Sequence, residues 1–388
     1  MNPLRVLWCE TYDDGTIGGS HTCMFNLASR LDPDRFKVTA AFYSPNLYVE
    51  RYTAAGIETI ILPGPIDRGP SLLGRMRRSL SSRFLLPWAV RRALAVRRIG
   101  LVVLNNSVFA SAPFIEAGAA RGIPMVAYER GTGIPRPKQL PSLAATARLA
   151  ASLPVSQSVR EHIVRIGFKT PRIEVIYDGI DPNVQPTRPA EAVRAELGLR
   201  RNDRVIGMVG NVRAWKGQHV FVDAFFQLAE KRPDVHGLIV GAWSDADREY
   251  HADLVRKIAE RGLERRLRFL GYREDVRDLL NTMDVMVHAS TSPEPWGMVL
   301  LEAMAARRPV VATAMGGPLE ILDNGRCGLL VPPGDAKAMA HAVDRYLSDA
   351  PFRDEMVTRA RARVESMYDI RQTVAHTSEL FAQVAGAR

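Results

Sequence analysis

Two glutamates, Glu294 and Glu302, lie eight residues apart in the segment STSPEPWGMVLLEAMA at 290–305. Pro293 and Pro295 forbid helix before residue 295 but suit the first turn of one. We therefore expect Glu294 in a loop that leads into a helix, and Glu302 about two turns inside that helix. Such carboxylates can accept hydrogen bonds from hydroxyls at two ends of one sugar-containing ligand. The alternative is a pair of ordinary surface glutamates, one of them a favourable charge at a helix N-terminus.

Between the two glutamates, the backbone amides of Gly297, Met298 and Val299 are expected at the start of the helix. Unpaired amides at a helix N-terminus form a ready site for phosphate. Gly297 also lets a ligand come close to the backbone, because it has no side chain. The segment therefore predicts a site for a phosphorylated carbohydrate.

A second candidate segment, VIGMVGNVRAWKG at 205–217, combines a buried strand with basic side chains. We expect the strand to end at Gly210, and the polar turn after it to present Arg213 and Lys216 before a helix begins near Gly217. Cations at the carboxyl end of a strand can neutralise a pyrophosphate. Exposed loop charges are the alternative interpretation.

Two weaker patterns contain glycine or aspartate. Gly18, Gly19 and Ser20 follow the first predicted strand, where backbone amides could approach a phosphate, although a plain tight turn is the alternative. Asp245 and Asp247 form an Asp-x-Asp triplet, which metal-dependent transferases of another fold use. Here the triplet opens a helix, where aspartate suits N-capping, so we expect no metal site.

The elements that must position these residues follow an alternating strand–helix rhythm in two halves. Short apolar runs without polar alternation, separated by helical patterns, predict parallel sheets covered on both faces. The expected strands are Leu4–Cys9, Phe36–Tyr43, Thr59–Leu62, Leu101–Leu104, Met125–Ala127, Leu149–Val155, Ile173–Tyr177, Arg204–Val209, Gly237–Val240, Leu267–Leu270, Val285–His288, Val310–Thr313 and Leu329–Val331. The expected helices are Ser20–Leu31, Leu86–Arg98, Ser156–Ile166, Gln218–Lys231, Arg248–Arg261, Val276–Met283, Gly297–Ala306, Ala336–Leu347 and the C-terminal segment Pro351–Arg388.

We therefore expect an α/β protein with two doubly wound, Rossmann-like domains and a ligand-binding cleft between them. The N-terminal domain is expected over residues 1–180 and the C-terminal domain over 191–370. The linker at 181–190 overlaps a proline-rich stretch at 179–189 that lacks apolar periodicity. Residues 371–388 should form a helix that packs back on the first domain.

The chain has 388 residues, of which 46% are hydrophobic and 24% charged. This composition is ordinary for a globular protein and disfavours collagen-like, disordered and disulfide-scaffold classes. We find no apolar stretch of about 18 or more residues and no secretory signal at the start. Cys9, Cys23 and Cys327 are too few and too far apart for a disulfide framework or a zinc site, which favours a reducing, cytoplasmic location.

Basic residues are concentrated in one region. The net charge is +10, and nine arginines lie between Arg68 and Ile115 without any aspartate or glutamate. From Arg75 to Arg98 they are mixed with apolar residues such as Trp88, a pattern typical of helices that lie on an anionic membrane surface. A solvated helical face is the alternative. Nucleic acid is disfavoured as a partner, because no recognition motif accompanies the charge.

Together these segments resemble the family-4 retaining glycosyltransferases (glycosyl transferases group 1), which have the GT-B architecture, along essentially the whole chain. The two glutamates with the following Gly-Gly-x-x-Glu are the most specific part of the match. The matching motifs are GGS at 18–20, SQSVREHI at 156–163, VIYDGID at 175–181, GNVRAWKGQ at 210–218, GYREDV at 271–276, EPWGMVLLEAMA at 294–305, GGPLEI at 316–321 and GLLVPPGD at 328–335.

The resemblance implies roles for the candidate residues. Glu302 matches the glutamate that holds the ribose hydroxyls of the donor nucleotide, and Glu294 matches the one that contacts donor-sugar hydroxyls. The amides of Trp296–Val299 would surround the sugar and the pyrophosphate. Lys216 matches the diphosphate-binding lysine of the family, and Gly19 matches the first-domain turn that approaches the diphosphate.

The chain departs from the family pattern at two places. Asn211 stands where the family usually has an arginine, so Arg213 is expected to supply the missing charge. The family often has a histidine that touches the donor sugar after a first-domain strand. This chain has Glu129 and Arg130 there, and either could take over that contact or bind the acceptor. The following loop, residues 131–138, would then face the acceptor.

The resemblance implies transfer of a sugar from a nucleoside-diphosphate sugar, with UDP as the favoured nucleotide, to a hydroxyl of a glycan or lipid-linked acceptor. It also implies retention of the anomeric configuration. A front-face route, in which the leaving phosphate assists deprotonation of the acceptor, needs neither a protein nucleophile nor a metal cofactor. Glu320 matches a further carboxylate near the cleft, with helix capping as the alternative. The expected setting is bacterial cell-surface polysaccharide or glycolipid synthesis, in the cytoplasm or on the inner membrane face.

Two other classes of function stay open. A GT-B-like epimerase would interconvert nucleotide sugars without an acceptor, and a catalytically silent protein would bind a nucleotide sugar without turnover. A dehydrogenase is disfavoured because no G-x-G-x-x-G fingerprint opens the first helix. Contacts to the base are expected from backbone near Gly271–Arg273, and the sequence leaves the donor sugar, the acceptor and the oligomeric state open.

Overall fold

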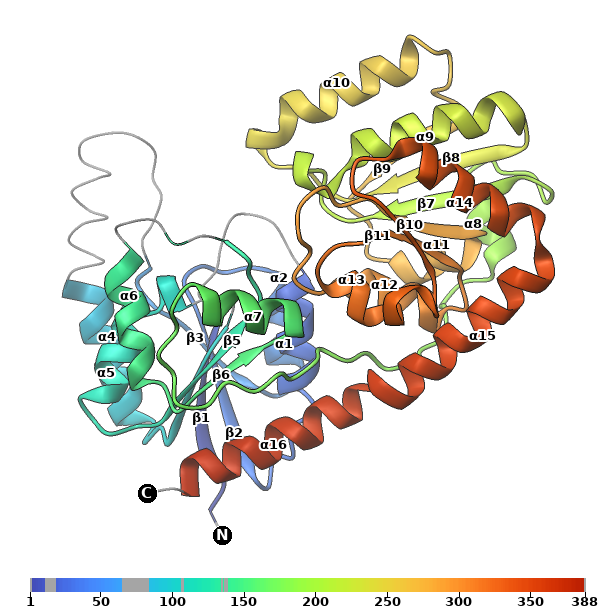
Figure 1. Cartoon of the computed structure of the whole chain (residues 1–388). Coiled ribbons are helices and arrows are strands. Elements are labelled where there is room, and N and C mark those ends of the chain that lie inside the picture. Colours follow the sequence, from blue (N-terminus) through green and yellow to red (C-terminus); the bar gives the residue numbers. More distant parts are fainter. Residues whose placement is uncertain are drawn as a thin grey trace. The chain divides into compact units, whose positions relative to one another are not determined.

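The computed structural model describes residues 2–10, 19–64, 84–105, 108–133, 135 and 139–386. The chain divides into two compact units, one made of Met1–Asp178 with Ile370–Arg388 and the other of Gly179–Asp369 (Figure 1). Gly18, the arginines from 68 to 83 and part of the loop 131–138 lie outside the described residues, as do the predictions made for them.

The first unit contains a six-stranded parallel sheet with the strand order β3-β2-β1-β4-β5-β6. This is the order of a doubly wound sheet, as predicted. The strands are β1 (Leu4–Glu10), β2 (Phe36–Phe42), β3 (Glu58–Ile61), β4 (Leu101–Leu104), β5 (Met125–Glu129) and β6 (Ala151–Pro154). The helices are α1 (Gly19–Ala28), α2 (Leu47–Ala54), α4 (Leu86–Val96), α5 (Ala112–Ala119), α6 (Leu140–Ala145), α7 (Gln157–Arg165) and α16 (Ile370–Gly386).

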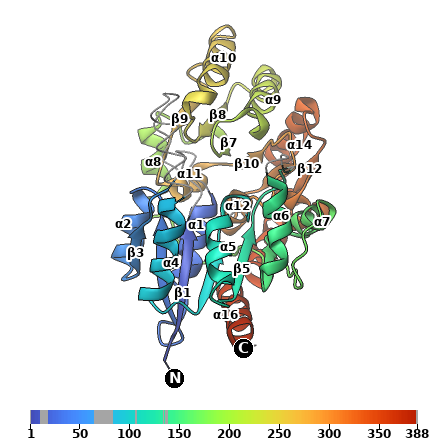
Figure 2. The same ribbon diagram turned by 90° about the vertical axis from the view of Figure 1, so that its left-hand side faces the viewer.

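Successive residues of β1 point to opposite faces of this sheet. Val6 and Trp8 belong to a core that α1 and α16 close, while Leu7 and Cys9 belong to a second core that α4 and α5 close (Figure 2). Because both faces are buried, the central strands are mostly apolar rather than alternating between apolar and polar residues.

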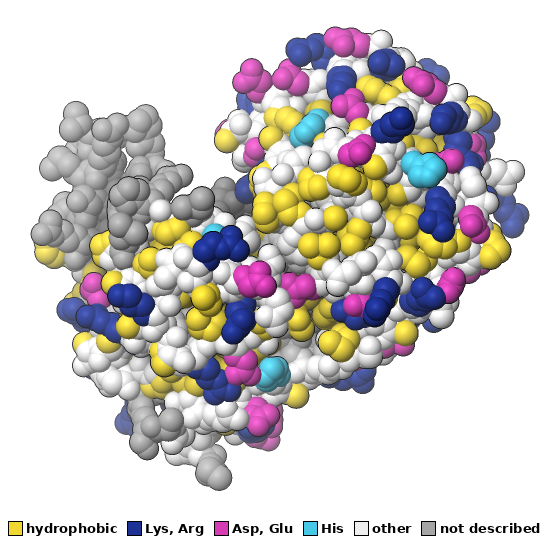
Figure 3. All heavy atoms as spheres, in the orientation of Figure 1, with side chains coloured by type: hydrophobic (Ala, Val, Ile, Leu, Met, Phe, Trp, Pro, Cys, Tyr) yellow, Lys and Arg dark blue, Asp and Glu magenta, His cyan; other side chains and the backbone are white. Residues whose placement is uncertain are grey.

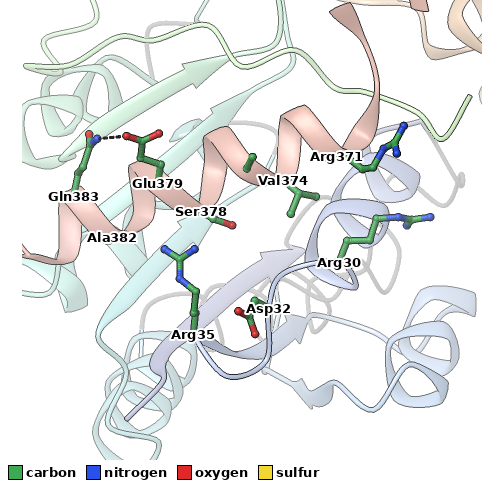
Figure 4. Close-up of a pocket in the computed structure, with 10 residues that line it drawn as sticks. Arg30, Asp32, Arg35, Arg371, Val374, Ser378, Glu379, Ala382 and Gln383 are labelled. Atoms are coloured by element: carbon green, nitrogen blue, oxygen red, sulfur yellow. Dashed lines mark hydrogen bonds between the residues drawn. The ribbon is translucent and has the colours of Figure 1, made fainter. Parts of the chain in front are cut away.

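The C-terminal helix α16 is an integral part of the first unit. The ring of Phe381 lies 6.1 Å from that of Trp8 in an edge-on arrangement. On its other side, α16 borders a groove with the segment between α1 and β2, and Figure 4 shows Arg30 and Arg371 at one end of this groove. No predicted site residue lines the groove.

The second unit repeats the architecture, with the strand order β12-β11-β10-β7-β8-β9. The strands are β7 (Arg204–Val209), β8 (Val235–Val240), β9 (Leu267–Gly271), β10 (Val285–His288), β11 (Val310–Thr313) and β12 (Leu329–Val331). The helices are α8 (Ala190–Glu196), α9 (Gln218–Lys231), α10 (Arg248–Ala259), α11 (Val276–Thr282), α12 (Met298–Ala305), α13 (Gly317–Ile321), α14 (Ala336–Ser348) and α15 (Ala350–Met367). Phe221 and Phe225 of α9 and Tyr346 of α14 fill the core on one face of the sheet.

In each sheet the strand order reverses at one point, between β1 and β4 in the first unit and between β7 and β10 in the second. Ligands of open α/β sheets bind outside the carboxyl ends of the strands at this switch point. Lys216 and Glu294 lie in the segments that follow β7 and β10. The strand order therefore places both residues near the switch point of the second sheet.

The strand predicted at Ile173–Tyr177 is wrong. This segment runs beside β6, but only Ile173 forms a bridge, to Ser152. The amide of Ile176 donates to the carbonyl of Pro154, and Pro154 cannot return a bond because proline has no N–H. Sequence analysis also missed the short helices α2, α5, α8 and α13, whose five to eight residues are too few for a clear apolar period.

Within the second unit, the stretch from Gly179 to Pro189 contains neither helix nor strand. It is nonetheless anchored, because the backbone amide and the hydroxyl of Thr187 both donate to the carboxylate of Asp278, each at 2.7 Å. None of the described helices in either unit is long and apolar enough to cross a membrane.

Candidate active site

The turn after β7 brings Lys216 to the end of β10. A short 3-10 turn, Ala214–Lys216, is followed by Gly217 with a φ of 78°. A Cβ atom at Gly217 would lie 1.9 Å from the carbonyl oxygen of Ala289, so only glycine permits this approach. The amide of Thr291 donates to the carbonyl of Trp215 at 2.8 Å and holds the two segments together.

Lys216 and Glu294 are in direct contact. The Nζ atom of Lys216 lies 2.6 Å from Oε2 of Glu294, whose side chain is only 9% exposed. Nε2 of His288 and Oγ of Ser290 face the same oxygen at 3.1 and 3.2 Å. Burial by itself raises the pKa of Glu294, but the Lys216 charge and the His288 hydrogen bond outweigh it and hold that pKa well below its usual range.

The loop after β11 braces the backbone of Glu294. The amide of Gly317 donates to the carbonyl of Glu294 at 2.8 Å. Gly316 has a φ of 69°, and a Cβ there would lie 2.3 Å from the same carbonyl oxygen. Gly316 is therefore required by close backbone packing against Glu294, and Gly317 by packing against Trp296, whose carbonyl oxygen would lie 2.4 Å from a Cβ there. Sequence analysis did not assign this role to the Gly-Gly pair.

Helix α12 starts immediately beyond Glu294. Gly297 is its N-cap, with a φ of 110°, and no side chain caps the helix, so its first amides are left for another partner. Glu302 is the fifth helical residue and lies about one turn in, rather than the two turns predicted. Burial raises the pKa of Glu302, against the opposing charge of Arg277. The indole of Trp296 is buried edge-on against Tyr368, 5.3 Å between ring centres.

Arg213 is placed differently from Lys216. Its Nε atom lies 3.8 Å from Oδ2 of Asp247, which also accepts a hydrogen bond from Ser244 at 2.5 Å. Asp247 occupies the N-cap position of α10, but its side chain does not cap the helix, contrary to the expectation from sequence. The carbonyl oxygen of Asn211 accepts from Gln218 at 3.0 Å.

The loop Gly271–Arg273, which was expected to contact the base, already makes hydrogen bonds within the second unit. The carbonyl of Gly271 accepts the amide of Gly241 at 2.8 Å. The guanidinium of Arg273 donates to Asp275 at 2.6 and 2.7 Å and to Glu196 at 2.9 Å, so each of its three nitrogens already faces a carboxylate. A base would therefore meet this loop through backbone atoms.

In the helix that follows the Gly-Gly pair, α13, the carbonyl oxygen of Glu320 accepts hydrogen bonds from Arg363 at 2.8 Å and from the hydroxyl of Tyr368 at 3.2 Å. These bonds tie the backbone at Glu320 to the end of α15.

In the first unit, Gly19 is the first residue of α1 and is exposed. Arg130, one of the two candidates for the missing histidine, is instead a structural cation. Its guanidinium donates to both oxygens of Asp178, at 2.6 and 2.8 Å, and to Asn105 at 2.7 Å. The Arg130 and Asp178 side chains are 6% and 4% exposed, so this pair is closed to a ligand.

Glu129 has a different environment. It ends β5, is 4% exposed, and accepts a hydrogen bond from the backbone of Val108. Among the described residues, its Oε1 atom has no hydrogen-bond partner. Burial raises the pKa of Glu129 to about 8, although the Val108 hydrogen bond and the Arg130 charge oppose the shift. A neutral carboxylic acid with an unused oxygen therefore lies at the carboxyl edge of the first sheet.

Sequence analysis did not single out His288, Ser290, Asn105 or Asp178. The available signal was their position, because each is a polar residue at or just beyond the end of an apolar run. Polar groups at carboxyl strand ends face the ligand edge of an open sheet.

Among the described residues, no group of three or more His, Cys, Asp or Glu side chains is arranged to hold a metal ion. All three cysteines are buried as free thiols.

Two family models match the chain. The model described as Glycosyltransferase Family 4 matches residues 17–184, and the one described as Glycosyl transferases group 1 matches residues 189–363. Together they leave unmatched only residues 1–16, a short gap at 185–188 and residues 364–388.

Curated relatives match over part of their length. A lipopolysaccharide core biosynthesis mannosyltransferase, LpsB of Rhizobium meliloti, is 30% identical over 235 residues, 59% of this chain and 62% of that protein. A D-inositol 3-phosphate glycosyltransferase of Corynebacterium urealyticum is 34% identical over 210 residues, 53% of this chain and 48% of that protein. The chain thus spans about half the length of the curated relatives it matches.

Solved structures match the whole chain in fold. Anabaena Alr3699/HepE, in complex with UDP-glucose, has a TM-score of 0.84 at 24% identity, covering 98% of this chain and all of that one. WaaG, a glycosyltransferase involved in lipopolysaccharide biosynthesis, has a TM-score of 0.71 at 18% identity, covering 97% and 99%. The predicted fold class, GT-B with two doubly wound domains, is confirmed.

Proposed function

The chain belongs to the family-4 glycosyltransferases, and from this premise we propose that it is a retaining glycosyltransferase. The donor is a nucleoside-diphosphate sugar with UDP as the favoured nucleotide. The acceptor is a hydroxyl of a glycan or a lipid-linked glycan in bacterial cell-surface polysaccharide or glycolipid synthesis. The contact between Lys216 and Glu294 carries the proposal, because it joins a cation suited to a diphosphate and a carboxylate suited to a sugar at the switch point.

Cleavage of the bond between sugar and phosphate leaves negative charge on the departing nucleoside diphosphate. Lys216 and the uncapped amides around Gly297 and Met298 are fixed before the reaction at the place where that charge would grow. Such prearranged donors stabilise a transition state without reorganisation. Glu294 would accept hydrogen bonds from hydroxyls of the sugar, and Glu302 from hydroxyls of the ribose.

Retention is proposed to follow a front-face route. The departing phosphate oxygen takes the proton of the acceptor hydroxyl while the new bond forms on the same face of the sugar. The Lys216 charge and the His288 hydrogen bond hold the pKa of Glu294 below its usual range, so its carboxylate is a weak nucleophile, which supports a route without a covalent enzyme intermediate.

Arg213 is proposed as a second cation for the diphosphate, in place of the arginine that Asn211 cannot provide. At 3.8 Å its pairing with Asp247 is loose, and both side chains are partly exposed, at 26% and 21%. A diphosphate could therefore compete for Arg213 at small cost. With two cations from the chain itself, we expect transfer to need no metal cofactor.

On the first unit, Glu129 is proposed to contact the acceptor or the donor sugar, while Arg130 is withdrawn from that role by its closed pair with Asp178. A buried acid with a raised pKa can donate a hydrogen bond to a sugar hydroxyl as well as accept one. Gly19 remains the proposed approach of the first unit to the diphosphate.

We further propose a cytoplasmic protein that attaches peripherally to the inner membrane face through the segment Arg75–Arg98. In its described part, Phe84, Leu85 and Trp88 are 60%, 54% and 59% exposed near the start of α4. Arg91 and Arg92 are exposed one turn later. On the face of the second unit shown in Figure 3, acidic and basic side chains are instead interspersed, a surface without a preference for anions.

Flotation with vesicles of anionic lipid tests the attachment. The wild-type chain should float with anionic vesicles and stay behind with neutral ones, and Trp88→Ser with Arg91→Gln should weaken flotation. Wild-type protein that stays in the soluble fraction with both vesicle types would refute the proposal. Arg201→Gln, in the turn before β7, removes the same single charge from another exposed position and is the control.

The proposed reaction is tested with UDP-glucose, UDP-N-acetylglucosamine and GDP-mannose, with and without a glycolipid extract as acceptor. We expect transfer, or slow hydrolysis, of one of these donors and its loss in Glu294→Ala. Conversion of one nucleotide sugar into another without acceptor would reassign the chain to an epimerase. Binding without any turnover would reassign it to a silent nucleotide-sugar-binding protein.

A further inference from the structure

The carboxylate of Glu294 is held asymmetrically. Three donors from two separate segments converge on its Oε2 atom: Nζ of Lys216 at 2.6 Å, Nε2 of His288 at 3.1 Å and Oγ of Ser290 at 3.2 Å. No described residue donates to Oε1. An ionised carboxylate offers about four acceptor positions, so the unused capacity is concentrated on one oxygen.

The proton on His288 can be assigned from this geometry. A carboxylate oxygen only accepts hydrogen bonds, so the Nε2 atom that faces it must carry the proton. Nδ1 of His288 is buried and has no hydrogen-bond partner in the part of the chain that the structure describes. His288 ends β10 and is 4% exposed, so strand packing rather than solvent sets the direction of its N–H bond.

Ser290 is fixed from the other side. Its carbonyl oxygen accepts the hydroxyl of Thr313 at 2.9 Å, which ties the segment after β10 to the end of β11. Ser290 is 1% exposed and Thr313 is fully buried. Since Nε2–H of His288 already points at Oε2, the Ser290 hydroxyl adds a further donor to that oxygen.

We infer that His288 and Ser290 are positioning residues that lock Oε2 of Glu294, so that Oε1 is the atom that accepts a hydroxyl of the donor sugar. The inference rests on the proposed function and deepens it, because it names the atom that recognises the sugar and the residues that aim it. Without the lock, the carboxylate turns about its terminal bond and the sugar loses a fixed acceptor.

The role predicts a specific loss. His288→Leu and Ser290→Ala should weaken binding of the nucleotide sugar about tenfold, since a hydrogen bond to a charged group is involved. Binding of the nucleoside diphosphate without its sugar should change less than twofold. His288→Gln should restore sugar binding, because its amide nitrogen can donate from nearly the same place as Nε2.

The experiment compares UDP-glucose with UDP, and GDP-mannose with GDP, by isothermal titration calorimetry on the full chain. The sugar should raise the affinity of one of these two ligand pairs more than that of the other in wild-type protein. That ligand pair is then measured for each variant. His236→Leu is the matched control, because His236 lies near the amino end of β8, beside Asp203, away from the carboxyl edge. It should keep the wild-type gain from the sugar.

Each outcome is informative. If His288→Leu and Ser290→Ala both keep the wild-type increase in affinity that the sugar provides, the positioning role is overturned while the proposed function stays intact. Parallel loss of sugar-bearing and sugar-free ligands also overturns it, because that indicates general damage to the site. If wild-type protein binds neither pair, the proposed function itself fails. Ser290→Ala removes a single oxygen and keeps the test open if His288→Leu does not fold.

Discussion

The ammonium of Lys216 lies 2.6 Å from Oε2 of Glu294, although the two residues are 78 positions apart in the chain. They come from the segments after β7 and β10, the two strands that flank the switch point of the second sheet. At this distance the two charges neutralise each other in the absence of a ligand. In the proposed complex, the diphosphate also binds Lys216 and a sugar hydroxyl donates to Glu294.

Lys216→Met removes the charge and keeps the length of the side chain. We expect kcat/KM for the donor to fall about 100-fold or more, because a prearranged donor to the leaving diphosphate is lost. Lys257→Met is the control, since Lys257 also pairs with a carboxylate, Asp223, but on the surface. Comparable activity in the two variants would contradict the assignment of Lys216.

The same substitution changes the pH dependence of stability. The Lys216 charge and the His288 hydrogen bond hold the pKa of Glu294 below its ordinary value of 4.5, despite burial. A carboxylate with a lowered pKa stabilises the fold above that ordinary value and loses the contribution as pH falls below it. Thermal unfolding should therefore show Lys216→Met less stable than wild type from pH 7 down to about pH 4.5, with the difference shrinking as the pH falls further. A difference that stays constant from about pH 5 to about pH 3 would argue against the ion pair.

For Glu129 we expect the opposite dependence of folding stability on pH. Its pKa is raised to about 8 by burial, so between 4.5 and 8 the folded chain holds a proton that the unfolded chain releases. Stability must then fall as pH rises through this range, by at most about 1.4 kcal/mol per pH unit. Glu129→Gln removes the titration and should be more stable than wild type at pH 8 but not at pH 4.5. Melting temperatures at the two pH values check this.

Gly217 tests the close approach that brings Lys216 to Glu294. Gly217 and Gly334 have almost the same φ, 78° and 79°, but a Cβ would collide with Ala289 at Gly217 and meet nothing within 4 Å at Gly334. Gly334→Ala should cost about 1–2 kcal/mol from left-handed backbone alone. Gly217→Ala should cost clearly more and weaken donor binding as well. Equal losses in chemical denaturation would show that the approach is not tight.

Metal independence is tested by chelation. Because Lys216 and Arg213 are proposed to supply the positive charge for the diphosphate, transfer should keep its rate after dialysis against EDTA. Asp247→Asn, which removes the ion pair between Asp247 and Arg213, should leave that insensitivity unchanged. Loss of activity in EDTA with recovery on addition of Mg²⁺ or Mn²⁺ would overturn this part of the proposal.

The architecture was readable from the sequence because its signals are local. Apolar runs such as Leu101–Leu104 and Val310–Thr313 became buried parallel strands within a residue or two of their predicted bounds. The segment at Ile173–Tyr177 failed for a reason in another element, since Pro154 of β6 has no N–H to continue the ladder. The two glutamates, the lysine and the glycine-bounded turns were likewise visible as types and spacings.

What only the tertiary structure decided is which of these groups meet. Arg130 looked free for a ligand in sequence, but the fold places Asp178, 48 positions away, against its Nε atom and one of its two terminal nitrogens. Lys216 was expected to face a diphosphate, with an exposed loop charge as the alternative, and the strand order sets it on Glu294. Residue type and spacing determine what chemistry a segment can offer. The partner of each charge depends on which strands are neighbours, and that is a property of the whole sheet.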